Sequence, residues 1–483
     1  MTRGLRVAAL SLGAANAIDF VLQFLLPVIL ARVLDTQDFG VYRLFWLITS
    51  TALALSTLGI PQSLYYFLPR SEAAEKRLYI NQAILFLAAT GFLAAVAILP
   101  GSPVLPDNAD VLGRYGLLPS AFALLWIVSN LLDFLPTADG RPVWHAKAIV
   151  GLSVTRTLAL GGAAMLTGSI SAVLWAMMGF VLFKSSLLVM YMVRHHGVAG
   201  PYATKAAFHE QASHALPFGL AGMLFNLRSQ ADQWVAAALF TISQYAAFSV
   251  ASVLAPLIGL FRQSMNQAFL PRMSKLQADG DAGSMLDLNN QANVALALLL
   301  FPLLAYAFAF SDSLISLIYT PAYAQGGEVM RVYVLGMVAL SVEVNNVMLL
   351  LKEGRFASRV NFVALCVCIA ASFWFAHFLG LAGAAVGSVL AVYLDRVLTL
   401  RRMSKRLMLP MAALQDWSAL GRILLAASIA AAAAWAATMA IPSGLPLVVR
   451  LGLAGGMLAV AYLPMLWALG MWTTLRELAV RAR

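Results

Sequence analysis

Charged side chains recur inside long apolar runs of this sequence. Asp19, Arg156, Lys184, Arg228 and Arg262 each lie within such a run, several residues from its ends. A charged side chain at the centre of a membrane-spanning helix costs roughly 2.5–3.5 kcal/mol on insertion, so it requires a lumen, an ion partner or a function. Arginine and lysine bind anions such as phosphate, whereas a buried carboxylate can hold a cation or a proton. The pattern therefore indicates polar positions inside an apolar molecule.

The acid nearest the N-terminus has polar neighbours on its own helix face. Asn16, Asp19 and Gln23 follow one another at spacings of three and four residues, which place them on one side of a helix. One hypothesis makes Asp19 a lumen-lining acid or a proton or cation site. The other makes it a packing residue that is satisfied by internal hydrogen bonds. The sequence leaves both open.

Arg228 and Asp232 also share a helix face, because they are four residues apart. They either neutralise each other as an ion pair, or Arg228 contacts an anionic substrate while Asp232 tunes its charge. Spacing alone does not separate these two interpretations.

Arg262 differs in having no acid within reach on its own helix, where Asn266 follows one turn later. This isolation makes Arg262 the leading candidate for a contact with an anion. An ion pair with Asp19 or Glu343 is the alternative.

The remaining intramembrane charges have less specific interpretations. Lys184 and its counterpart Arg396 either contact a substrate or extend their side chains to the headgroups. Other acids within the apolar runs or near their ends are expected to be structural partners: Asp133, Asp312, Glu343 and Asp395. The candidate anion contacts are Arg262, Arg228, Arg156 and Lys184, and the candidate lumen or ion-coupling acids are Asp19, Asp232 and Glu343.

The elements that must position these residues are membrane-spanning helices. Hydrophobic residues make up 61% of the chain and charged residues 11%, too few to cover a soluble globule. Apolar runs long enough to span a bilayer recur from end to end and predict an all-α polytopic membrane protein with about 14 spans. The expected spans are 7-31, 41-68, 78-100, 111-136, 143-167, 169-193, 213-239, 245-270, 291-319, 329-351, 359-379, 381-403, 420-441 and 445-471.

The distribution of basic residues predicts the orientation of these spans. The net charge of +11 does not form the long stripe or tail that is typical of nucleic-acid binding. Most Lys and Arg residues instead lie in alternate loops and at both ends, which predicts cytoplasmic termini. Arg3 and Arg6 before a short apolar stretch resemble a signal peptide. An uncleaved first helix is favoured, because the apolar pattern continues to about Leu30.

Internal repeats divide the spans into two copies. Short motifs recur at similar offsets: Phe67-Leu68-Pro69-Arg70 with Phe269-Leu270-Pro271-Arg272, Asp139-Gly140-Arg141 with Glu353-Gly354-Arg355, and Gly168 and Lys184 with Gly380 and Arg396. They predict two six-helix pseudo-repeats, a lobe at 1-200 and a lobe at 211-405, followed by an extra helix pair at 420-471. The expected substrate path lies between the lobes.

Motifs for enzymatic or metal chemistry are not found. Cys366 and Cys368 lie two residues apart in an apolar run and should point to different helix faces. The histidines form no ligand set, and no phosphate-binding loop for nucleotide is present. We therefore expect no catalytic residues, no metal and no cofactor.

Several motifs also resemble a known family. They are Leu30-Ala31-Arg32-Val33-Leu34, Asp38-Phe39-Gly40-Val41-Tyr42, Leu58-Gly59-Ile60-Pro61, Phe67-Leu68-Pro69-Arg70, Asp232-Gln233-Trp234, Leu314-Ile315-Ser316-Leu317-Ile318-Tyr319 with Pro321-Ala322-Tyr323, and Gly380-Leu381-Ala382-Gly383-Ala384-Ala385. Their order and spacing resemble the Wzx-type polysaccharide and O-antigen flippases. These flippases form the polysaccharide transporter family of the multidrug/oligosaccharidyl-lipid/polysaccharide exporter superfamily.

The resemblance implies a flippase of the bacterial inner membrane. Its expected substrate is a polyprenyl-diphosphate-linked oligosaccharide for O-antigen or exopolysaccharide synthesis, moved by alternating access. Its expected partners are this lipid-linked glycan, membrane lipids, H⁺ or Na⁺ as coupling ion, and other polysaccharide assembly proteins, but no nucleic acid. The resemblance also implies a substrate contact for Arg43, near the outer end of the second span.

Two rival functions stay open. A cation-coupled multidrug antiporter of the same superfamily would use unpaired acids, for which Asp19 and Glu343 are candidates. A membrane glycosyltransferase or polymerase would usually need a sizeable outer loop with catalytic residues, whereas the longest expected outer loop is the short segment near 101-110. We therefore expect a transporter and not an enzyme.

Overall fold

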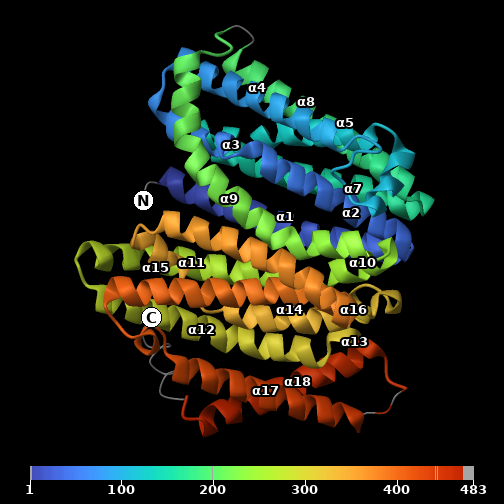
Figure 1. Ribbon diagram of the computed structural model, residues 1–483, viewed down its shortest axis with the longest axis vertical. Helices are drawn as coiled ribbons and strands as arrows, with labels where there is room; N and C mark the ends of the chain where they lie inside the picture. The colour runs from blue at the N-terminus through green and yellow to red at the C-terminus, as the bar shows by residue number, and fades with distance from the viewer. Residues whose placement is uncertain (1–2, 198–199, 441, 443, 472–483) are drawn as a thin grey trace. The chain divides into compact units, whose positions relative to one another are not determined.

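A computed structural model describes residues 3–197, 200–440, 442 and 444–471 (Figure 1). Its regular elements are all α-helices and short 3₁₀ helices in this part of the chain. The chain divides into two compact units, Met1–Ala246 and Ala247–Arg483. The basic residues at the two ends of the chain, which contribute to the predicted orientation, lie outside the described residues: the side chains of Arg3 and Arg6, and Arg476, Arg481 and Arg483.

In the part of the chain that the structure describes, the first unit contains nine complete α-helices and the start of α10, which crosses the boundary at Ala246. Many begin at residues that can cap a helix, such as Asp35, whose carboxylate accepts a hydrogen bond from the backbone N–H of Asp38 at 2.7 Å. Long pairs such as α1 with α7, α7 with α8, and α4 with α5 pack side by side. The helices are α1 (Arg3–Val33), α2 (Thr36–Thr57), α3 (Ile60–Phe67), α4 (Ala73–Ala97), α5 (Leu118–Ser129), α6 (Leu135–Ala138), α7 (Pro142–Thr167), α8 (Ile170–His196), α9 (Lys205–Leu239) and α10 (Ile242–Val250).

The predicted span 41-68 is broken between α2 and α3. Leu58 and Gly59 both adopt left-handed backbone conformations, with φ values of 41° and 78°. Gly219 of α9 packs against this break so closely that an added Cβ would overlap the Leu58 carbonyl. The break therefore depends on a contact with a distant helix, and the sequence prediction of one continuous helix was wrong here.

The second unit contains eight α-helices. One of its elements, α16, bends at Gly380. The two halves of α16 correspond to the predicted spans 359-379 and 381-403. The predicted span 329-351 is interrupted at residues 341–344, between α14 and α15. The helices are α11 (Ala255–Ala278), α12 (Ala282–Ala309), α13 (Ser311–Ile318), α14 (Gly326–Leu340), α15 (Asn345–Leu350), α16 (Gly354–Leu407), α17 (Trp417–Met439) and α18 (Leu447–Ala468).

The two halves of α16 pack together through small residues. Gly380 has a φ of 59°, and after it the chain returns along the first half. A Cβ on Gly383 would overlap the Phe375 carbonyl, and one on Gly387 would overlap Ser372. Such close backbone contact requires glycine and is typical of helix packing in membranes.

The helical pattern confirms a polytopic membrane protein of about 14 helices. Eleven helices in the described part of the chain are long and apolar enough to cross a membrane. That count takes the bent α16 once and leaves out the charged α9 and the interrupted α14–α15 segment. The division at Ala246–Ala247 falls later than the repeat boundary that the sequence predicts near residue 211, because α9 packs against α2, α3 and α4.

The two Asp/Glu-Gly-Arg motifs make similar contacts in their own units. Asp139, before α7, accepts a hydrogen bond from the Tyr191 hydroxyl at 2.9 Å and pairs with His196 near the end of α8. Glu353, before α16, accepts three bonds from Arg402, two at 3.0 Å and one at 3.1 Å, and one from Arg406. Each acid thus joins the start of one helix to the far end of the helical segment that follows.

These contacts keep both carboxylates ionised. Burial acts to raise the pKa of each acid, but the hydrogen bonds and the neighbouring positive charges outweigh it. The pKa of Asp139 is therefore held below its usual value of 3.8, and that of Glu353 below 4.5.

Glu353 should make stability depend on acid pH. A lowered folded-state pKa contributes stability that is complete above the unfolded pKa of 4.5 and is lost as pH falls through the folded value. We expect Glu353→Gln to unfold at a lower temperature than wild type at pH 7, and to lose less stability than wild type on acidification. Thermal unfolding of the purified protein measures both. The exposed Glu328 supplies the control, and a Glu328→Gln protein that behaved like Glu353→Gln would contradict this assignment.

Candidate functional site

A cavity within the first unit collects four of the eight charged site residues that the sequence singles out: Arg43, Arg156, Lys184 and Asp19. It consists of two adjoining chambers that share Gln23, Trp46, Trp126, Arg156 and Phe180. We call the smaller one the arginine chamber and the larger one the carboxylate chamber. Their volumes are about 190 Å³ and about 530 Å³.

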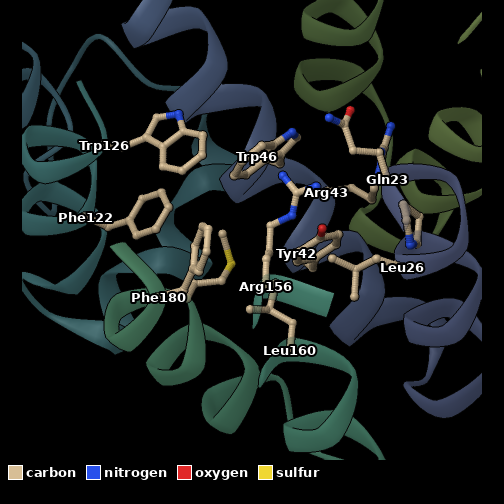
Figure 2. Close-up of a pocket in the computed structure, with 12 residues that line it drawn as sticks. Gln23, Leu26, Tyr42, Arg43, Trp46, Phe122, Trp126, Arg156, Leu160 and Phe180 are labelled. Carbon is tan, nitrogen blue, oxygen red and sulfur yellow. The ribbon is translucent and has the colours of Figure 1, made fainter. Parts of the chain in front are cut away.

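The arginine chamber is defined by Arg43 and Arg156 (Figure 2). Arg43 comes from α2 and Arg156 from the middle of α7, and Figure 2 shows the Arg156 side chain extending into the pocket. Tyr42, Trp46 and Phe180 also line it. Two guanidinium groups against apolar walls form a site for an anion, because low-dielectric surroundings strengthen charge-assisted hydrogen bonds.

An aromatic cluster supports this chamber. The ring centroids of Phe122 and Trp126 are 5.7 Å apart in a stacked arrangement, and Trp46 meets Trp126 edge to face at 5.3 Å. Phe45 does not line the chamber but packs against Phe122, with ring centroids 5.0 Å apart. Such packing fixes the side of the cavity that faces Arg156.

Arg156 is held at the boundary between the chambers. Its Nη2 lies 3.4 Å from Asp19 Oδ1, and its buried Nε donates no hydrogen bond within the described part of the chain. Asp19 also accepts hydrogen bonds from Gln23, at 2.6 Å, and from Ser153. One long contact leaves Arg156 with donors available for a ligand.

The carboxylate chamber is defined by Asp19 and Asp133. Asn16, Asp19 and Gln23 all line it, which confirms the predicted shared face of α1. Asp133, in the 3₁₀ turn Asn130–Asp133, pairs with Lys184 of α8 at 2.8 Å. The Lys184 ammonium also lies 4.6 Å from the centroid of the Trp126 ring, a cation–π contact.

Lys184 is therefore buried in an ion pair. Its side chain is 5% exposed, so the snorkelling interpretation is wrong for Lys184. Asp133 was expected to be a structural partner, and it is, but it also lines the cavity. Arg396, at the matching position of the predicted second repeat, has different partners: it contacts the adjacent Asp395 and donates to the Ala339 carbonyl.

Arg228 and Asp232 of α9 do not line either chamber. Arg228 lies 5.5 Å from the ring centroid of Phe225, on its own helix. Asp232 is buried and accepts a hydrogen bond from the backbone N–H of Gln233 at 2.8 Å. A substrate contact at Arg228 stays a prediction.

In the second unit, Arg262 of α11 pairs with Glu343, the partner that the sequence offered as an alternative. Arg262 Nη2 lies 2.5 Å from Glu343 Oε2, and the Glu343 side chain is 6% exposed. Asn289 and Asn293 of α12 both donate to the Glu343 carbonyl, at 3.1 and 3.2 Å. Glu343 is thus fixed from three sides at the break between α14 and α15.

Several polar and aromatic residues of the carboxylate chamber were not predicted from the sequence, and four of them bear on its chemistry. They are Tyr65, Trp126, Thr137 and His145, and His145 bonds to the Thr137 hydroxyl at 2.6 Å. A signal existed for His145, a polar residue three positions into an apolar run that also contains Arg156. Tyr65 and Trp126 resemble ordinary core aromatics in sequence, so only their position identifies them.

A family model described as polysaccharide biosynthesis protein matches residues 29–328, well over half of the chain. A search of curated protein sequences gives no significant match.

Solved structures share the fold at low sequence identity. The lipid II flippase MurJ, in an inward closed conformation, superposes with a TM-score of 0.69 at 16% identity, over 94% of this chain and 97% of that one. An inward-facing multidrug resistance MATE family transporter of the MOP superfamily gives a TM-score of 0.59 at 14% identity, over 83% and 94%. The MATE transporter VcmN of Vibrio cholerae gives 0.52 at 13% identity, over 83% and 98%. The chain therefore belongs to the polysaccharide biosynthesis protein family, as a multi-pass membrane protein with the fold of the MurJ flippase and the MATE transporters.

Proposed function

We propose that the protein is a flippase that moves a polyprenyl-diphosphate-linked oligosaccharide across the bacterial inner membrane. The glycan serves O-antigen or exopolysaccharide synthesis. The observation that carries this proposal is the pair of adjoining chambers, one with two arginines and one with neutral polar groups and carboxylates. The proposed substrate also has two adjoining parts, an anionic diphosphate that would meet the arginines and a polar sugar that would meet the polar groups.

The arginine chamber suits the diphosphate. Arg43 and Arg156 can each present a planar fork of donors to phosphate oxygens, and such bonds are about twice as strong as neutral ones. The sugar occupies the wet carboxylate chamber, while the polyprenyl chain stays in lipid. Alternating access would open the cavity to each side of the membrane in turn.

The proposed topology and energy source complete the model. Both termini face the cytoplasm, because basic residues concentrate in the loops on that side. The membrane potential or a gradient of H⁺ or Na⁺ drives the cycle, with Asp19, Asp232 and Glu343 as the acids considered for coupling. Other polysaccharide assembly proteins supply the substrate and take up the product.

A cation-coupled multidrug antiporter is the second candidate. The observation that favours it is the pair of carboxylates, Asp19 and Asp133, in the same cavity. A carboxylate in a low-dielectric cavity attracts an organic cation. The two candidates differ in the charge of the substrate. The flippase substrate brings an anionic diphosphate to Arg156, whereas the antiporter substrate is an organic cation that the carboxylates attract.

Transport by the purified protein in vesicles separates these functions. The substrate is a fluorescent short-chain polyprenyl diphosphate oligosaccharide placed in both leaflets, and a membrane-impermeant reductant bleaches the outer one. We expect the protein to make the protected pool accessible, with no uptake of a fluorescent cationic drug under a proton or sodium gradient. Drug uptake without movement of the glycolipid would establish the antiporter instead.

A further inference from the structure

Asp133 of the carboxylate chamber faces its space, and the cation that pairs with it, Lys184, is more deeply buried. The Asp133 side chain is 42% exposed, whereas the Lys184 side chain that pairs with it is 5% exposed. Lys184 is covered by the Trp126 ring on one side and by Asp133 on another. A molecule in this chamber therefore meets the Asp133 carboxylate more readily than the Lys184 ammonium group.

Asp133 has an oxygen available to accept hydrogen bonds. Asn130 donates to Asp133 Oδ2 at 3.0 Å, and Lys184 donates to the same oxygen at 2.8 Å. Asp133 Oδ1 receives no hydrogen bond from the residues that the structure describes. Because each carboxylate oxygen accepts about two bonds, Oδ1 can take donors from a ligand.

Apart from Asp19 and from Arg156 at the boundary with the arginine chamber, the groups that face Asp133 across the chamber are mostly neutral, polar or aromatic. Asn16, Thr137 and His145 add donors and acceptors, and the ring of Tyr65 is exposed at the same space. The volume of about 530 Å³ lies within the roughly 300–1,000 Å³ that is usual for small-molecule sites. These walls match a molecule with several hydroxyl donors and an apolar ring face.

We propose that the carboxylate chamber binds an uncharged sugar unit, with Asp133 accepting hydrogen bonds from its hydroxyl groups, and that it discriminates against sugars that carry a carboxylate. This inference rests on the proposed function, in which the arginine chamber binds the adjoining diphosphate. An acidic sugar would bring its carboxylate close to Asp133, and two like charges at short range repel each other. Asp133 is thus the residue that determines specificity.

A matched set of ligands tests this directly. Binding to the full-length protein in lipid nanodiscs is measured at pH 7.4 for a short-chain polyprenyl diphosphate that carries glucose, glucuronic acid or no sugar. Glucose and glucuronic acid differ only at C6, where the acid has a carboxylate. We expect the glucose conjugate to bind about tenfold or more tightly than each of the other two.

Asp133→Asn isolates the charge from the shape of the chamber. It removes the negative charge and leaves the positive charge of Lys184, so the glucuronic acid conjugate should bind as tightly as the glucose conjugate or more tightly. Asp110→Asn is the matched control, because Asp110 is an exposed acid of the same unit that lies outside the chamber. This control should keep the wild-type preference.

The possible outcomes distinguish failure of this inference from failure of the proposed function. Equal binding of the two conjugates by wild type, or an unchanged preference in Asp133→Asn, overturns the inference alone. So does a bare diphosphate that binds as tightly as the glucose conjugate. Failure of all three ligands to bind contradicts the proposed function. If Asp133→Asn does not fold, Tyr65→Leu takes its place, and it should weaken binding of the glucose conjugate without affecting the bare diphosphate.

Discussion

Replacing Arg262 by alanine is expected to destabilise the protein by about 3–5 kcal/mol, because it leaves the carboxylate of Glu343 buried without its charge partner. The Glu343 carboxylate cannot move into water to reduce this loss of stability. The Glu343 backbone is held by Asn289 and Asn293, and Asn345 donates to its side chain at 2.8 Å. The measurement is the unfolding temperature of the purified protein, together with its yield in the membrane.

Two variants show whether the effect comes from the buried charge. Adding Glu343→Gln to Arg262→Ala removes that charge and should recover much of the lost stability. Arg272→Ala is the control for loss of an arginine from α11, since Arg272 is exposed. An Arg262→Ala protein that is as stable as wild type but inactive in transport would instead restore Arg262 as a substrate contact.

Arg156→Ala is expected to reduce the initial transport rate about 100-fold or more while the protein stays folded. Loss of two charge-assisted hydrogen bonds to a diphosphate, at about 1.5–3 kcal/mol each, corresponds to at least this factor. Folding should persist, because Asp19 keeps its hydrogen bonds to Gln23 and Ser153 after the substitution. The rate is measured with the fluorescent glycolipid in vesicles.

Arg156→Lys and Arg114→Ala sharpen the interpretation. Lysine keeps the charge but cannot form a bidentate contact, so Arg156→Lys should retain a small part of the activity. Arg114 is exposed in the same unit, and its replacement should leave the rate unchanged. Wild-type transport by Arg156→Ala would remove the arginine chamber from the proposed mechanism.

The positions of the helices were predictable from sequence because the bilayer imposes the length of each apolar run. Their interruptions were not. The left-handed pair Leu58–Gly59 is supported by Gly219, and the break at residues 341–344 is supported by Asn293, which accepts from the Glu343 N–H. Both supports come from helices far away in sequence, so no local pattern could reveal them.

The candidate site was predictable in its residue types but not in its pairing. Intramembrane charge alone singled out Asp19, Arg156 and Lys184, and they line one cavity with Arg43. The pairing of Lys184 with Asp133, and of Arg262 with Glu343, depends on the depth and rotation of each helix against its neighbours. A single sequence contains neither quantity, which is why the isolation of Arg262 on its own helix was misleading.

The contacts of Asp139 and Glu353 have a mechanical consequence. The α7–α8 segment turns at Gly168 and is joined again at its open end by Asp139, while α16 turns at Gly380 and is joined by Glu353. A helical hairpin that is closed at both ends behaves as a rigid frame. Bending during a transport cycle should therefore concentrate in helices that carry an internal proline and lack such a closure, such as α1 with Pro27 and α9 with Pro217.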